Sequence, residues 1–175
     1  MSLLLSRPIA YFIDFVMLWF ICIIPQLLAF HFLNGAPFKY FTEPVLIYFW
    51  IMMTVSFPMW IYFIFTEKSE KQATLGKRLM GLKVQSVIGT RINRKQSLYR
   101  TAIKLLPWEI AHLGLIPVYE SGGFQPDHGQ FEFEPNFALY LSNLILIVFV
   151  IYFLAKRGKQ TIHDIVSESK VIIFK

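Results

Sequence analysis

Cysteine is nearly absent from this chain. Cys22 is the only one in 175 residues, so neither an intrachain disulfide nor a cysteine-based metal cluster can form. The four histidines are scattered along the sequence and form no H-x-x-x-H pair, so this common zinc motif is missing too. We therefore expect no metal site.

The sequence also lacks the motifs of the common enzyme classes. It contains no G-x-S-x-G nucleophile elbow and no G-x-G-x-x-G dinucleotide fingerprint. The glycine- and lysine-containing stretch 74–84 is not a phosphate loop, because no glycine lies five residues before Gly76 and no Ser or Thr follows Lys77. We expect no catalytic residues, no cofactor and no enzymatic activity.

Charged residues are few beside apolar ones. Hydrophobic residues make up 55% of the chain, above the 45–50% or so that is typical of soluble domains, which indicates a membrane protein. The net charge of +6 would suit nucleic acid, but the basic residues concentrate between and after the apolar runs. Anionic lipid headgroups are therefore the expected partner, and nucleic acid is not.

Four apolar segments are expected to be transmembrane helices, because about 20 apolar residues cover a hydrocarbon core of about 30 Å. Lys104, Glu109 and His112 interrupt the third segment, and periodicity alone would also allow an interfacial helix there. The four predicted spans cover residues 8–30, 44–65, 101–119 and 136–154.

The distribution of charge predicts on which side of the membrane each connecting region lies. Regions 66–100 and 155–175 are rich in Lys and Arg, whereas loop 31–43 carries only Lys39 and loop 120–135 carries acidic residues and no Lys or Arg. By the positive-inside rule the two basic regions are cytoplasmic and the two loops are extracytoplasmic, provided that the third segment spans. We thus predict an all-α membrane protein, a single four-helix bundle over residues 1–175 with both termini in the cytoplasm.

A small cytoplasmic cap is predicted from two further stretches. Thr74 is a candidate N-cap, followed by a short basic helix, a glycine stop and a strand at 82–87. This elbow is expected to contact lipid headgroups or to serve as a structural turn through Thr74, Gly76, Lys77, Arg78 and Gly81. In the tail, Thr161 can cap a second short helix before a strand near 171–174, and pairing of the two strands would bring Asp164 toward Arg7.

Arg7 and Asp14 are the charged residues of the first apolar segment. Seven residues of helix turn through about 700°, so both lie on nearly one face, roughly 10 Å apart along the axis. A carboxylate there is costly unless it is paired, hydrated or protonated. Arg7, Asp14 and Asp164 are a candidate ion or proton site, or a cluster that fixes packing and shares Arg7 between the two aspartates. Candidate relay or packing residues are Lys104, Glu109, His112 and His163.

Three motifs resemble the RDD family of membrane proteins, which is named for one arginine and two aspartates. They are Arg7-x-x-Ala10-x-x-Ile13-Asp14, then T-L-G-K-R-L-x-G-L-x-V from Thr74, then Q-T-I-H-D ending at Asp164. The resemblance assigns the naming triad to Arg7, Asp14 and Asp164. It implies a polytopic membrane fold, and transport has been proposed for the family, with cation/proton exchange suggested for some members. A bacterial inner membrane is the expected location. The chain departs from the family where Val166-Ser-Glu-Ser replaces the usual Ala-Gly-Thr step.

Two functions remain open at this point. The protein is expected to transport a small cation or a proton as an oligomer, or else to be a non-catalytic accessory or assembly subunit of a larger membrane complex. The acidic loop could dock a partner protein through Phe124, Phe131 and Phe133, or simply lie against the bilayer surface.

Overall fold

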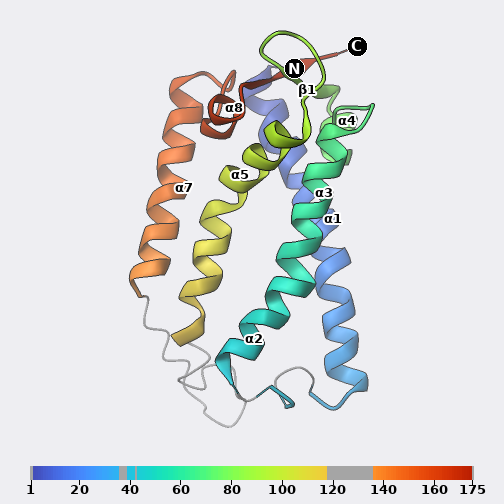
Figure 1. The fold of residues 1–175 in the computed structure, drawn as a ribbon, viewed down its shortest axis with the longest axis vertical. Helices are drawn as coiled ribbons and strands as arrows, with labels where there is room; N and C mark the ends of the chain where they lie inside the picture. Colours follow the sequence, from blue (N-terminus) through green and yellow to red (C-terminus); the bar gives the residue numbers. More distant parts are fainter. Residues whose placement is uncertain (1, 36–38, 42, 118–135, 175) are drawn as a thin grey trace. The chain divides into compact units, whose positions relative to one another are not determined.

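The computed structural model describes residues 2–35, 39–41, 43–117 and 136–174, which are mostly helical with one small two-stranded sheet (Figure 1). The predicted acidic loop, with Phe124, Phe131 and Phe133, lies outside the described residues. The elements are α1 (Leu3–Phe32), α2 (Pro44–Ile51), a π-helical turn η1 (Met52–Ser56), α3 (Phe57–Lys68), α4 (Leu75–Leu79), β1 (Leu82–Ser86), α5 (Arg94–Gly114), α7 (Phe137–Ala155), α8 (Ile162–Val166) and β2 (Ser169–Ile173).

Among the described residues, three helical stretches are long and apolar enough to cross a membrane: Leu3–Phe32, Pro44–Lys68 and Phe137–Ala155. They coincide with three of the four predicted spans. Many of their large apolar side chains are exposed on the protein surface, as a lipid environment requires and an aqueous one disfavours. The third predicted segment forms helix α5, which is 21 residues long but is not among these three apolar stretches.

Helix α5 begins at Arg94, ahead of the predicted start at residue 101, because its first turn is capped. The backbone N–H of Gln96 donates to Asn93 Oδ1 (2.9 Å), and the backbone N–H of Asn93 donates to Gln96 Oε1 (3.0 Å). This reciprocal pair is the arrangement of a capping box and fixes the start of the helix. The polar turn before the apolar segment is therefore helical.

The second span contains a π-helical turn, Met52–Ser56, which ends two residues before Pro58. Proline has no backbone N–H to donate, and its ring clashes with the carbonyl group four residues earlier. A wider turn at this place accommodates the ring and keeps the helix continuous to Lys68. Pi-helical turns in α-helices occur frequently at functional sites.

The described chain forms two compact units. The first comprises residues 1–20, 59–105 and 147–175, and the second comprises residues 21–58 and 106–146. The first unit holds the sheet, α4 and α8 near the amino end of α1 (Figure 1). The sites described below each lie within one unit.

The predicted strand pairing is confirmed. β1 and β2 are antiparallel, with Val84 opposite Val171, and β1 alternates buried and half-buried side chains as a strand packed on one face does. Val84 and Val171 belong to a small apolar core with Ala10 of α1, Leu82 and Ile92. The sheet therefore attaches the carboxyl-terminal tail to the first helix.

Candidate functional site

A buried charge network connects the ends of helices in the first unit. Arg7 of α1 donates to Asp164 of α8 (Nη2 to Oδ2, 2.6 Å), and Asp164 also accepts from Arg100 of α5. Arg100 continues to Glu67 of α3 (Nε to Oε2, 2.9 Å). The side chains of Asp164 and Glu67 are 0% exposed and that of Arg100 is 1% exposed, so the network is shielded from water.

Glu67 is the acidic centre of one half of this network. Its Oε1 accepts from Lys104 Nζ (2.7 Å) and from Lys77, while Oε2 accepts from Arg100. The ammonium group of Lys104 also lies 4.0 Å from the centre of the Phe63 ring, a cation–π distance. One carboxylate thus pairs with three basic side chains, of which Arg100 also pairs with the second carboxylate of the network.

Asp164 is the acidic centre of the other half, and the local sequence positions it there. It is the N3 residue of a capping box, in which its carboxylate accepts from the backbone N–H of Thr161 (2.8 Å). Burial would raise the pKa of Asp164, but the charges of Arg100 and Arg7 outweigh burial and hold it well below its usual range. Asp164 therefore stays ionised and serves both as a helix cap and as an ion-pair partner.

The Arg7 side chain contacts the carboxyl-terminal tail because the tail backbone at Gly158 passes very close to helix α1. Its guanidinium donates to the carbonyl groups of Gly158 (3.3 Å) and Lys159 (3.1 Å) and to Thr161 Oγ1. Gly158 adopts φ +73°, and a Cβ there would lie 2.4 Å from Leu4 Cα. Only glycine permits this approach.

Asp14 lies apart from the charge network, within the same unit. Its carboxylate accepts from Tyr62 Oη (2.7 Å), Thr74 Oγ1 (2.6 Å) and the backbone N–H of Gly76 (2.7 Å). The Arg7 guanidinium instead donates to the tail, so the expected sharing of Arg7 between Asp14 and Asp164 is wrong, although Asp164 does approach Arg7 as predicted. Neutral donors from α3 and α4 satisfy Asp14 in place of the arginine.

The basic elbow is built around that hydrogen-bonded aspartate. Thr74 caps α4 by accepting from the backbone N–H of Lys77 (3.3 Å), and Gly76 lies against the backbone of α1. Gly81 ends the elbow with φ +65°. Of the two basic residues, Lys77 points inward to Glu67, whereas Arg78 is exposed.

The predicted relay residues divide among these places. Lys104 belongs to the charge network, and His163 Nε2 lies 3.9 Å from Asp164 Oδ1. Glu109 and His112 lie in the second unit, where both contact Ser56 at the end of the π-helical turn. Ser56 Oγ donates to Glu109 Oε2 (3.0 Å) and lies 3.1 Å from His112 Nδ1. We name these three residues the Ser56 cluster.

Reasoning from the sequence missed Glu67, Arg100 and Ser56. Glu67 and Arg100 stand just outside the predicted apolar segments 44–65 and 101–119, where charged residues are ordinarily taken as interfacial anchors. Their signal is that opposite charges flank two segments expected to be antiparallel neighbours. Ser56 carries a weaker signal, its position two residues before a proline inside a span. Across the described part of the chain, no group of three or more His, Cys, Asp or Glu residues converges as metal ligands would.

Lowering the pH is expected to destabilise the folded protein through His163 first and through Asp164 only at lower pH. Burial and the neighbouring charge of Arg100 hold the pKa of His163 well below its usual range, so the folded protein resists a proton that the unfolded chain accepts near pH 6.5. Stability should therefore fall as pH drops below about 6.5, by up to about 1.4 kcal/mol per pH unit. It should fall further below about pH 4, where the unfolded chain binds a proton at the Asp164 carboxyl that the folded protein resists. Thermal unfolding in detergent between pH 8 and pH 5 measures this. His163→Gln should flatten the profile in that range, and an unchanged slope in this variant would contradict the assignment.

Comparison with models of protein families places the chain in a family. The model of the RDD family matches residues 1–168, which include all three motifs that carry the resemblance. No curated protein and no solved structure matches the chain significantly.

Proposed function

The chain belongs to the RDD family of membrane proteins, and we propose that it moves a proton or a small cation across the membrane through the Ser56 cluster. The observation that carries this proposal is the convergence of a carboxylate, an imidazole and a hydroxyl group on one point. Ionisable groups inside a membrane are costly and are concentrated at ion and proton pathways.

The position of Ser56 along its helix supports placing the Ser56 cluster near the bilayer midplane. Ser56 lies midway along the candidate span Pro44–Lys68, and its hydrogen bonds bring Glu109 and His112 to the same depth. The Arg7–Asp164 pair, in contrast, lies near one end of the first candidate span. The Ser56 cluster is thus better placed for a transported ion than the residues that name the family.

The chemistry of the Ser56 cluster suits a small cation. The Glu109 carboxylate can exchange a proton for a cation such as Na⁺ or Li⁺, the Ser56 hydroxyl supplies a second oxygen, and His112 can accept the displaced proton. A proton crossing the full membrane potential gains about 2.3 kcal/mol per 100 mV, which is enough to drive exchange. No enzymatic step is part of this proposal.

Transport through this cluster requires α5 to cross the membrane as a fourth span. Both termini would then be cytoplasmic, with basic regions 66–100 and 155–175 facing anionic lipid on the inner face of a bacterial cell membrane. Four helices barely enclose a polar path, so we propose that the protein works as an oligomer. The exposed apolar side chains of its helices provide surfaces for contact between copies.

One observation favours a second candidate function. All carboxylates of the charge network and Asp14 are already bound by protein donors, which is the arrangement of a rigid scaffold. An accessory subunit that assembles with partner membrane proteins would need such a locked cap and no ion path.

Ion flux in proteoliposomes separates the two candidates. We expect the parent protein to couple proton movement to an imposed Na⁺, Li⁺ or K⁺ gradient, measured with an internal pH-sensitive dye. Glu109→Gln should reduce this flux at least about tenfold, because the amide cannot alternate between proton and cation. Equal elution of the two proteins in gel filtration confirms that the variant is folded.

Glu43→Gln is the matched control, because Glu43 is an exposed carboxylate whose side chain makes no cap hydrogen bond at the start of α2. Its flux should equal that of the parent. Flux retained in Glu109→Gln would contradict the Ser56 cluster as the site. Absence of flux in the parent with all three cations would contradict transport and favour the accessory function.

A further inference from the structure

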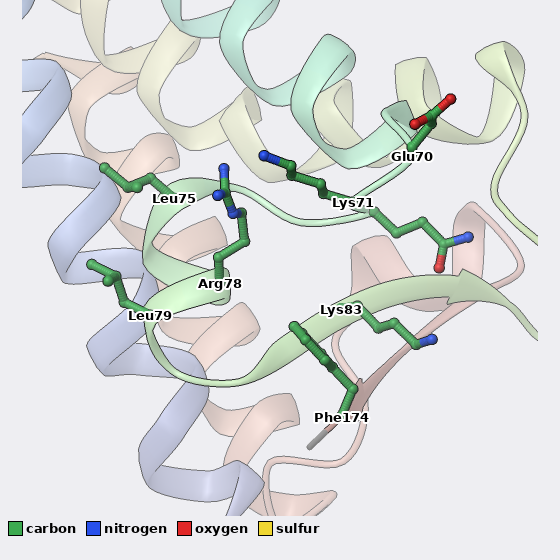
Figure 2. A pocket seen from close by; sticks show the side chains of 8 residues that line it. Glu70, Lys71, Leu75, Arg78, Leu79, Lys83 and Phe174 are labelled. Carbon is green, nitrogen blue, oxygen red and sulfur yellow. The ribbon is translucent and has the colours of Figure 1, made fainter.

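A pocket of about 680 Å³ opens beside α4 in the first unit, away from the charge network (Figure 2). Basic and apolar side chains line it, together with the carboxylate of Glu70 and the amide of Gln72. Those used below are Lys71, Leu75, Arg78, Leu79, Lys83 and Phe174.

The basic side chains of the pocket are available to a ligand. Lys71 and Arg78 are exposed, and within the described part of the chain neither forms an ion pair with a carboxylate. Figure 2 shows these two side chains extending toward one another over the pocket, while Lys83 extends along the strand beside Phe174. Lys77, which lies between Lys71 and Arg78 in sequence, instead forms an ion pair with Glu67.

The apolar wall of the pocket lies on the side of α1. Leu75 and Leu79 are 39% and 66% exposed, and Figure 2 shows both on the side of the pocket next to that helix. The close contact of Gly76 with Ala10 fixes α4 against α1, where Ile9 and Phe12 are also exposed. Apolar surface of the candidate span therefore continues onto the pocket wall.

We propose that this pocket binds the headgroup of an anionic phospholipid. The phosphate lies between Lys71 and Arg78, and the first methylene groups of the acyl chains pack on Leu75 and Leu79. The candidate span Pro44–Lys68 ends three residues before Lys71, so the pocket lies at the depth where headgroups occur. A soluble anion would use the two cations but would leave both leucines uncovered. This proposal is independent of transport.

Native mass spectrometry of the full chain in detergent tests the proposal. The probes are dioleoylphosphatidylglycerol and dioleoylphosphatidylcholine, each titrated separately. We expect the anionic lipid to be retained in preference to the zwitterionic one, and Lys71→Gln/Arg78→Gln to weaken its retention about tenfold or more, since each basic residue near a membrane surface contributes substantially to anionic lipid binding. Both residues are exposed, so the variant should fold.

Arg94→Gln/Lys95→Gln is the control, because it removes two exposed positive charges from the same unit outside the pocket. Its lipid retention should match that of the parent. An equal loss in both double variants would overturn the proposal in favour of diffuse surface charge. Displacement of the lipid by sn-glycerol 1-phosphate at equal concentration would show that the ligand is a soluble phosphate. Equal retention of both lipids by the parent would also overturn the proposal.

Discussion

Glu67→Gln is expected to lower the free energy of unfolding by about 3–5 kcal/mol, the usual cost of removing one partner from a buried ion pair. The amide keeps the size of the side chain but leaves Lys77, Arg100 and Lys104 without their shared carboxylate. Glu67 is fully buried, so water cannot replace the lost charge. The midpoint of thermal unfolding in detergent, compared with that of the parent, measures the loss.

Glu70→Gln is the matched control, since it makes the same change three residues later at an exposed site. It should leave the midpoint within about 1 °C of the parent value, as most exposed substitutions do. A double variant, Glu67→Gln/Lys104→Met, tests the cause. Removing one uncompensated cation should recover part of the stability, whereas a purely additive loss would contradict the electrostatic explanation.

The sequence predicts best those features that depend on neighbouring residues. Thr74 and Thr161 act as helix caps because a hydroxyl group there reaches the first free backbone N–H, and β1 alternates because its two faces differ in burial. These signals lie within a few residues of one another. Pairing of the two strands then brings Asp164 to Arg7, so one long-range contact follows from short-range patterns.

Contacts that depend on how helices pack against one another cannot be predicted from such short-range patterns. Helical spacing places Arg7 and Asp14 on one face and suggests a shared partner, but it does not show that α4 lies against α1 at Ala10 and delivers its own donors to Asp14. Glu67 and Arg100 are likewise distant in sequence, and neither belongs to a motif. Their pairing depends on tertiary packing.

The close approach of α4 to α1 makes Gly76 the second position with a large expected effect. In an exposed helix, Gly→Ala stabilises by about 1 kcal/mol, because alanine has the higher helix propensity. Here the new Cβ would lie 2.0 Å from Ala10 O, a backbone atom that no rotamer change can move aside. Gly76→Ala should therefore push α4 off α1 and weaken the hydrogen bonds to the buried Asp14, lowering stability by about 3 kcal/mol.

Coupling to Asp14 distinguishes this explanation from a general effect of losing glycine. In an Asp14→Asn background the hydrogen bonds from Thr74 and Gly76 are already weakened, so Gly76→Ala should cost less there than in the parent. Gly89→Ala is the comparison: Gly89 has φ +89° and no atom within 4 Å of a new Cβ, so it adds only backbone strain. Its cost should be the same in both backgrounds. Equal costs of Gly76→Ala in the two backgrounds would instead mean that the contact of α4 with α1 does not act through Asp14.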